Sequence, residues 1–240
     1  MKLLVSVRSV SEARLVAAGG ADFIDLKEPA RGALGDLPLS TVHAIVAALR
    51  VSAKHLPISA TIGDWDPGAR AEILRRVQSL GECGVDYVKV GVTRDPASAG
   101  LLEALAQSRW PVIPVFIADR GLDAPLVERA LALGFSGLMV DTAGKRAGSL
   151  FDLIALAELR RFIVAARAGG AIVGLAGALR VADVPALLAL EPDFAGFRSA
   201  VCAGERSGDL DATRLRALVD AVRRAQRLSA QGQLRRAEQQ

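Results

Sequence analysis

Short runs of apolar residues alternate along the chain with longer segments in which apolar positions recur every three or four residues. The short runs are rich in Val, Ile and Phe and predict strands at 3–7, 22–26, 57–61, 86–90, 111–117, 137–141, 171–175 and 193–198. The longer segments predict a helix after each strand, at 11–19, 39–50, 67–82, 97–109, 124–134, 149–169, 181–190 and 209–226. Ser11 is expected to cap the first helix, and Pro67 to stand in the first turn of the third.

The strict alternation of strands and helices predicts a parallel sheet. Eight strand–helix units with no linker between them predict a single (β/α)8 TIM barrel over residues 1–228, with 229–240 as a flexible C-terminal tail. An open, doubly wound sheet is the alternative fold. Such a sheet is expected to carry a GxGxxG sequence after an early strand, and the first strand and its following turn, LLVSVRSV, have none.

The choice of basic residues is uneven, because five are lysines and 25 are arginines. Three of the lysines, Lys27, Lys89 and Lys145, lie at or just after the ends of predicted strands. A buried lysine amine can lose its proton and attack a carbonyl carbon, whereas a guanidinium stays protonated. These lysines predict either covalent amine chemistry or an anion-binding site at the mouth of the barrel. A snorkelling or ion-paired lysine is the alternative for each.

Acidic residues accompany the lysines at the strand ends, where TIM barrels build their active sites. Because side chains alternate along a strand, Asp25 and Lys27 share one face, and Lys89 can point inward near the rim. Asp141 ends the sixth strand, and Lys145 follows in a loop flanked by glycine. We expect all five to converge on one basin, where a lysine with a lowered pKa acts as nucleophile and a second group moves protons. A structural Asp–Lys ion pair is the alternative.

Two glycine-bearing segments follow the seventh and eighth strands and predict a phosphate site. Backbone N–H groups left accessible by glycine bind phosphate, and TIM barrels frequently place phosphate after these two strands. The expected phosphate ligands are Gly174, Gly177, Gly196, Arg198 and Ser199. Close helix–strand packing is the alternative reason for the glycines. The loop at 27–38, also rich in Gly and Pro, either covers a substrate or only routes the chain to the second helix.

Several functional classes are not supported. The longest apolar runs are interrupted by Arg and Gly before reaching the roughly 20 residues of a membrane span, and the first residues lack a signal-peptide pattern, so we expect a cytoplasmic protein. The net charge of +4 comes partly from an arginine-rich C-terminal stretch without a nucleic-acid-binding module, so neither nucleic acid nor membrane is an expected partner. Cys83 and Cys202 predict neither a disulfide framework nor a metal site. His43 and His55 fall away from the mouth and receive no catalytic role.

Several segments resemble one enzyme family. LLVSVRSVSEAR at 3–14, GGADFIDLKEPARGALGDLP at 19–38 and MVDTAGKRAGSLFD at 139–152 are similar to the (5-formylfuran-3-yl)methyl phosphate synthases, also called 4-(hydroxymethyl)-2-furancarboxaldehyde-phosphate synthases. DYVKVG, GLAGAL and FAGFRSAVCAGER also follow the family's pattern, so the resemblance covers nearly the whole chain.

The resemblance implies a lyase that condenses two molecules of glyceraldehyde 3-phosphate, with loss of phosphate and water, to a furan that feeds methanofuran-type cofactors. It implies that Lys27 forms the Schiff base and that Lys89 accepts a proton. Asp141 and Lys145 correspond to the acidic residue and lysine of the family's DTxxK segment, and Asp25 to its strand-two acid. No metal or organic cofactor is expected, because the imine itself is the electron sink.

Two other readings stay open at this point. One is a different Schiff-base aldolase or a phosphate-binding isomerase on the same fold, since fold does not fix chemistry. The other is a non-catalytic barrel that binds a sugar phosphate. The expected partners are phosphorylated trioses, and exposed Leu- and Ala-rich helix faces predict a homo-oligomer.

Overall fold

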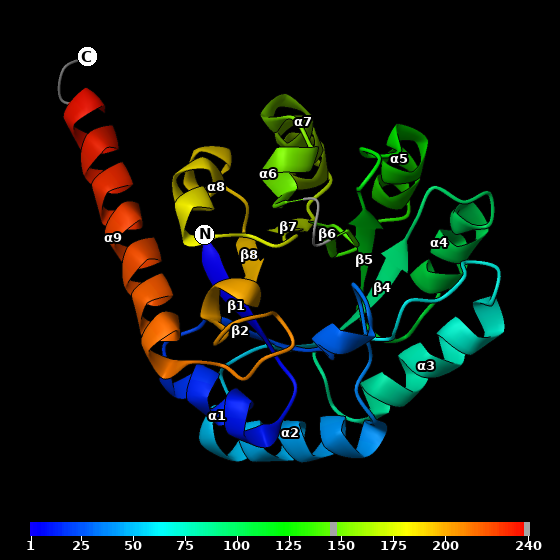
Figure 1. The fold of residues 1–240 in the computed structure, drawn as a ribbon. Coiled ribbons are helices and arrows are strands. Elements are labelled where there is room, and N and C mark those ends of the chain that lie inside the picture. Colours follow the sequence, from blue (N-terminus) through cyan, green and yellow to red (C-terminus); the bar gives the residue numbers. More distant parts are fainter. Residues whose placement is uncertain (145–147, 238–240) are drawn as a thin grey trace.

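The computed structural model describes residues 1–144 and 148–237, in which eight parallel strands close into a barrel surrounded by helices (Figure 1). Each strand pairs with the next along the chain, and β8 pairs with β1. The strands are β1 Lys2–Val7, β2 Phe23–Leu26, β3 Ile58–Thr61, β4 Tyr87–Val92, β5 Val112–Ile117, β6 Gly137–Asp141, β7 Ile172–Leu175 and β8 Phe194–Phe197. The predicted (β/α)8 barrel is confirmed, and every predicted strand overlaps an observed one.

Helices connect the strands and cover the outside of the barrel (Figure 1). The α-helices are α1 Val10–Ala18, α2 Leu39–Ser52, α3 Arg70–Glu82, α4 Ser98–Ala106, α5 Ala124–Ala132, α6 Leu150–Leu153, α7 Leu156–Ala168, α8 Val184–Leu190 and α9 Ala212–Ala237. Short 3-10 helices, η1 Pro29–Arg31, η2 Val181–Asp183 and η3 Ser199–Val201, follow β2, β7 and β8.

Two predicted helix starts were wrong. Ser9, not Ser11, caps α1, because Ser9 has extended backbone angles and its Oγ accepts from Glu12 N. Helix α3 begins at Arg70, so Pro67 precedes it instead of standing in its first turn. The Asp66 side chain accepts from Gly68 N, which forms a local turn that competes with the helix.

The single helix expected at 149–169 is divided into α6 and α7. Ile154 between them has extended backbone angles and is buried. Burial of this apolar side chain in the core interrupts a segment whose local sequence favours helix, which is a tertiary override of helix propensity.

The alternation along the strands separates two apolar regions. Outward-facing side chains such as Val5, Ile58 and Val90 pack beneath the helices in the larger core. The smaller, inner layer consists of Leu4, Ala33, Leu34, Ile113, Val115, Met139, Ala176 and Phe194. Because this layer fills the barrel, space for a ligand lies above it, at the carboxyl ends of the strands.

The glycine- and proline-rich loop between β2 and α2 folds back over the mouth of the barrel. Glu28 N donates to Gly35 O at 2.8 Å, and Leu34 N donates to Asp64 Oδ1 at 3.0 Å. Ala33 and Leu34 are buried in the inner layer. The loop therefore contributes to the top of the barrel as well as leading to α2.

Helix α9 packs against α8 and η3, and its C-terminal end extends beyond the barrel (Figure 1). It continues to Ala237, so the boundary expected at residue 228 falls inside a helix. Among the described residues, no helix combines the length and apolar character that crossing a bilayer requires.

Candidate active site

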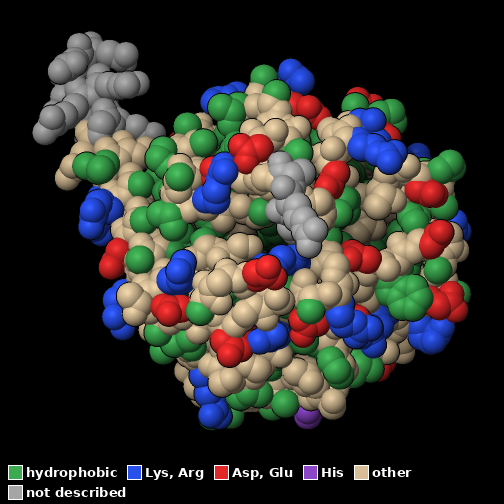
Figure 2. All heavy atoms as spheres, viewed as in Figure 1, with side chains coloured by type: hydrophobic (Ala, Val, Ile, Leu, Met, Phe, Trp, Pro, Cys, Tyr) green, Lys and Arg blue, Asp and Glu red, His purple; other side chains and the backbone are tan. Residues whose placement is uncertain are grey.

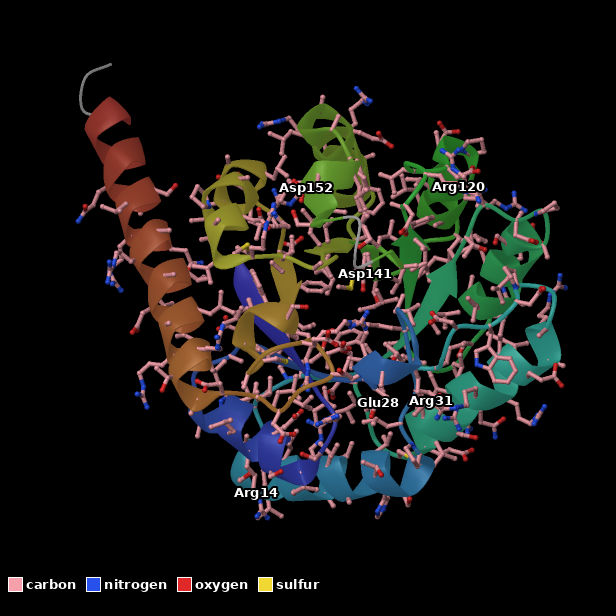
Figure 3. All side chains as sticks on the ribbon, viewed as in Figure 1. Arg14, Glu28, Arg31, Arg120, Asp141 and Asp152 are labelled. Atoms are coloured by element: carbon pink, nitrogen blue, oxygen red, sulfur yellow. The ribbon has the colours of Figure 1, made fainter. Side chains whose placement is uncertain are left out.

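Four charged side chains enter one pocket from the carboxyl ends of β2, β4 and β6. Asp25 lies in β2 with Lys27 two residues later, Lys89 lies in β4, and Asp141 is the last residue of β6. All four are buried, with exposed fractions of 2% for Lys89 and 8% for Lys27. Figure 3 places Asp141 near the centre of the barrel mouth. The structure brings these four predicted residues together; Lys145 lies outside the described residues.

Each lysine pairs with an aspartate from a different strand. Lys27 Nζ lies 3.3 Å from Asp141 Oδ2, and Lys89 Nζ lies 2.9 Å from Asp25 Oδ1. Asp25 and Lys27, which the sequence placed on one face, thus each form an ion pair with a residue of another strand. The arrangement leaves two amines in one pocket, each with its own carboxylate.

Asp25 is held by hydroxyl groups on both neighbouring strands. The parallel register puts Ser6 of β1 and Ser59 of β3 beside it. Ser6 Oγ donates to Asp25 Oδ2 at 3.0 Å and Ser59 Oγ to Oδ1 at 2.7 Å. Burial alone would raise the pKa of Asp25, but the charges of Lys89 and Lys27, together with the Ser59 hydroxyl donor, lower it below its ordinary value. Asp25 is therefore an ionised carboxylate inside the barrel.

Lys89 has the properties of a base. Burial lowers the pKa of Lys89, the nearby charge of Lys27 lowers it further, and the opposing effects of Asp25 and Asp141 do not restore it. Although Nζ lies within ion-pair distance of Asp25, no described residue accepts from it with hydrogen-bond geometry. A larger fraction of this amine is therefore neutral than in an exposed lysine, and only the neutral amine can abstract a proton.

Asp141 is oriented by the start of the loop that follows β6. Its Oδ1 accepts from Thr142 N at 2.7 Å, and its Oδ2 faces Lys27. The next two amides, Ala143 N and Gly144 N, donate to Asp119 at 2.7 and 2.5 Å. Asp119 was not expected from the sequence, although an Asp two residues beyond a strand is a recognisable signal.

The pocket occupies about 520 Å³, including its open mouth. Figure 2 shows this face hollowed near its centre, with charged side chains around the hollow. The lining residues are Leu4, Ser6, Asp25, Lys27, Leu34, Thr61, Lys89, Met139, Asp141, Ala176, Gly177, Ala178, Leu179, Gly196, Phe197, Arg198, Ser199 and Arg206. The carboxylate and amine lining suits a small polar ligand.

The predicted phosphate-binding residues divide into two groups. Gly177, Gly196 and Ser199 line the pocket. Gly177 has φ +116°, and a Cβ there would lie 2.8 Å from Thr142 Oγ1, so glycine is required. Gly174 lies lower on β7, where a Cβ would approach the Phe194 ring to 2.2 Å. Glycine at 174 therefore accommodates packing of the inner layer, and the structure does not bring it to the pocket.

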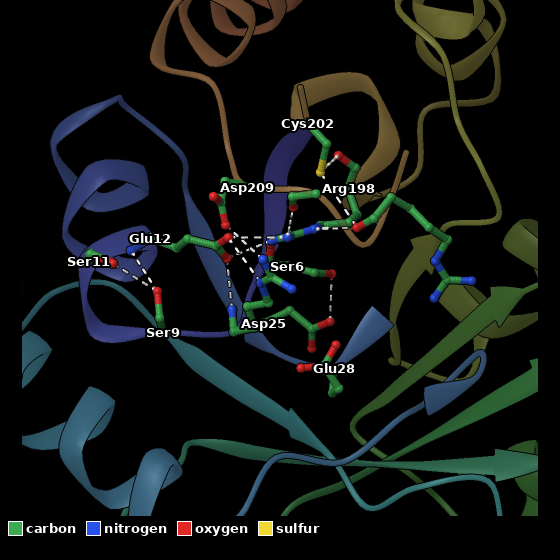
Figure 4. A network of polar contacts seen from close by, with 12 residues as sticks. Ser6, Ser9, Ser11, Glu12, Asp25, Glu28, Arg198, Cys202 and Asp209 are labelled. Atoms are coloured by element: carbon green, nitrogen blue, oxygen red, sulfur yellow. Dashed lines mark hydrogen bonds and ion pairs between the residues drawn. The ribbon is translucent and has the colours of Figure 1, made fainter. Parts of the chain in front are cut away.

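Arg198 lines the pocket but is fully engaged by protein oxygens (Figure 4). Its Nη1 donates to Glu12 Oε2 at 2.6 Å and to Ser6 O at 3.1 Å. Its Nη2 donates to Glu12 Oε1 and Gly208 O, and its Nε donates to Arg206 O. Because a guanidinium has five N–H groups, these contacts leave none free for a ligand.

Ser6, Ser59 and Thr61 were missed by sequence reasoning, although each is a polar residue at an inward position of an otherwise apolar strand. Arg206 also lines the pocket and lies in an irregular segment, where no periodic pattern predicts the direction of a side chain. Within the part of the chain that the structure describes, no group of three or more His, Cys, Asp or Glu side chains is placed to hold a metal ion.

Comparisons with known proteins give a consistent assignment. The 4-HFC-P synthase family model matches residues 3–219. A relative from Methylorubrum extorquens is 40% identical over 230 residues, covering 95% of this chain and 94% of the relative. The (5-formylfuran-3-yl)methyl phosphate synthase of Methanosarcina mazei is 35% identical over 228 residues, covering 86% of this chain and 93% of that protein.

Two solved enzyme structures have a similar fold. Phosphoribosyl anthranilate isomerase from Thermus thermophilus aligns with a TM-score of 0.66 at 20% identity, covering 92% of this chain and 98% of that one. The 3-hexulose-6-phosphate synthase of Salmonella typhimurium aligns with a TM-score of 0.61 at 21% identity, covering 92% and 100%. At these identities the likeness establishes the fold alone.

The closed barrel and its charged pocket, taken with these relatives, define a TIM-barrel enzyme. Within that class, the chain belongs to the 4-HFC-P synthase family.

Proposed function

We propose that the protein condenses two molecules of glyceraldehyde 3-phosphate to (5-formylfuran-3-yl)methyl phosphate through a Schiff base on Lys27, acting as a carbon–oxygen lyase. The observation that carries the proposal is the pair of lysines in one pocket, each matched to an aspartate but differing in burial. The relatives' names supply the product, and in this proposal the furan serves methanofuran-type cofactor synthesis.

Lys27 is assigned the covalent role because its amine lies at the mouth, beside Asp141. Its Nζ attacks the carbonyl carbon of one triose phosphate, and water leaves as the imine forms. Asp141, 3.3 Å away, holds the amine and passes protons during the addition and loss of water. The imine withdraws electrons from the neighbouring carbon and makes its hydrogen acidic.

Lys89 is assigned the base because it is more deeply buried and its pKa is lowered. It removes the acidic hydrogen, and Asp25 then stabilises the ammonium that results. The enamine carbon attacks the aldehyde carbon of the second triose phosphate. Elimination of phosphate, dehydration and hydrolysis of the imine complete the ring and release Lys27.

Phosphate is held at the other side of the pocket, where Gly177, Gly196 and Ser199 line it. Amides after β7 and β8 supply neutral donors at the position where TIM barrels frequently bind phosphate. Self-association through exposed helix faces stays a prediction.

The test is borohydride trapping with glyceraldehyde 3-phosphate, followed by peptide mass mapping and an ultraviolet assay for the furan aldehyde. We expect a triose adduct on Lys27 and a furan product. Lys27→Arg keeps the charge beside Asp141 but has no nucleophilic amine, so it should abolish turnover, while the exposed Lys54→Arg should not change it. Near-normal turnover in Lys27→Arg would remove Lys27 from the covalent role, and an aliphatic product would indicate an aldolase or isomerase.

A further inference from the structure

The cationic side chains of the pocket differ in what neutralises them. Lys27 and Lys89 each pair with an aspartate, and Arg198 pairs with Glu12 at 2.6 Å. Arg206 is the fourth cationic side chain among the described lining residues. No carboxylate of the described residues lies within ion-pair distance of it. Among the described lining residues, Arg206 is therefore the cation that a ligand anion can pair with.

The guanidinium of Arg206 lines the pocket and is partly exposed. Its Nη2 donates to Gly32 O at 2.8 Å, in the loop that begins with Lys27. Its Nε and Nη1 have no acceptor among the described residues. Burial lowers the pKa of Arg206, with Asp141 and Asp64 opposing the shift, but a guanidinium stays protonated near neutral pH. A half-buried cation with unused donors in a fixed fork suits a phosphate group.

The segment that carries Arg206 accepts hydrogen bonds from Arg198, which Figure 4 labels. Arg198 Nε donates to Arg206 O at 3.0 Å, and its Nη2 donates to Gly208 O at 2.6 Å. Arg8 Nη2 donates to Asp209 Oδ1 at 2.7 Å, which ties the same segment to the end of β1. The buried arginine therefore fixes the backbone from which the second arginine reaches the pocket.

We propose that Arg206 binds a phosphate group of the substrate and that Arg198 is the positioning residue that holds it in place. The identity of the substrate rests on the proposed function. A condensation of two triose phosphates brings two phosphate groups into one pocket, and the amides near Gly177 and Ser199 form a site for one of them without a side-chain charge. Arg206 supplies the charged site for the other, across the mouth beside the Lys27 loop.

The test uses glycerol 3-phosphate, which has the phosphate but no carbonyl and so binds without forming an imine. Titration calorimetry should show that wild type binds glycerol 3-phosphate and that Arg206→Ala binds it about tenfold to hundredfold more weakly, as for loss of a charge-assisted contact. Arg206→Gln keeps an amide donor but not the charge and should be weakened similarly, while Arg206→Lys should retain part of the affinity. Arg14→Ala is the matched control, because Arg14 is exposed on α1 away from the mouth (Figure 3).

A second measurement separates this inference from the proposed function. Borohydride trapping with glyceraldehyde, which lacks the phosphate, should label Arg206→Ala as well as wild type, whereas trapping with glyceraldehyde 3-phosphate should need about tenfold more substrate in the variant. Unchanged glycerol 3-phosphate affinity in Arg206→Ala, or no binding by wild type, would overturn the inference. Binding that depends on Arg206 without any imine in wild type would support the phosphate site and sink the Schiff-base function.

Discussion

Lys27 and Lys89 lie in the same pocket but face different surroundings. Lys89 is almost fully enclosed by the barrel, so desolvation disfavours its charged form, whereas Lys27 stands at the mouth beside Asp141. A residue that must give up a proton to act as base benefits from enclosure. A residue that must meet the substrate carbonyl benefits from access. The division of roles between the two amines follows from depth in the barrel.

Asp25→Asn should move the pH dependence of kcat. The negative charge of Asp25 raises the pKa of Lys89, so its removal should lower that pKa further. Lys89 must be neutral to act as base, so the acidic limb of the kcat profile should move to lower pH. The maximal rate should fall, because asparagine cannot stabilise the ammonium. A limb that moves to higher pH would contradict the role of Lys89, and the exposed Asp220→Asn is the control.

At the scale of elements, helix α1 links a local capping interaction to the site. Ser9 caps the helix, and Glu12 in its first turn holds Arg198. Ser9→Ala should lower the free energy of unfolding by about 1 kcal/mol, the usual cost of losing a cap. Ser11→Ala should cost less, because Ser11 is exposed and does not cap α1. Urea denaturation of both variants checks the order, and an equal or reversed order would contradict the assignment of Ser9.

The turn after β7 depends on a backbone conformation that favours glycine. Gly177→Ala would strain this turn at φ +116° and push a methyl group against Thr142. We expect a loss of about 1–3 kcal/mol in the free energy of unfolding, together with weaker glycerol 3-phosphate binding. Gly134→Ala is the control, because Gly134 also has positive φ but has no atom within 4 Å of the added methyl position. Urea denaturation and calorimetry measure the two effects, and equal losses of phosphate affinity in both variants would contradict a role for the Gly177 turn in binding.

At the scale of the whole molecule, the buried charges make stability depend on pH. The pKa of Asp25 is lowered from its ordinary value of 3.8, so its contribution to stability is present above that value and is lost as pH falls through the lowered pKa. The pKa of Lys89 is lowered as well, so protonating this lysine also destabilises the fold as pH falls. The Asp25 effect predicts that the barrel loses stability in acid, whereas the Lys89 effect acts as pH falls from 10.5 to the lowered pKa of this lysine.

The difference between the urea midpoints of wild type and Asp25→Asn should therefore be smaller at pH 3 than at pH 5. Wild type should be the more stable at pH 5, and the difference should shrink at lower pH as the carboxylate is protonated. A difference that grows in acid would contradict the lowered pKa of Asp25. Asp220→Asn again controls for removal of an exposed carboxylate.

The sequence by itself determined the strands, their order and the lysines at their ends. Period-two alternation put Asp25 and Lys27 on one face, and strict strand–helix alternation predicted the closed barrel. These features are local, since each depends on residues a few positions apart. The cap at Ser9 and the division of α6 from α7 were missed, because turn geometry and burial decide them.

Only the tertiary structure decided which charges meet. Lys27 contacts Asp141, 114 residues away, and Arg198 contacts Glu12, 186 residues away. Barrel closure brings these distant residues into contact, and no local sequence pattern indicates which residues will meet. The same closure buried Arg198, which holds the backbone of Arg206, and left the Arg206 side chain lining the pocket. The sequence shows that both residues are charged, but the fold decides which partners they have.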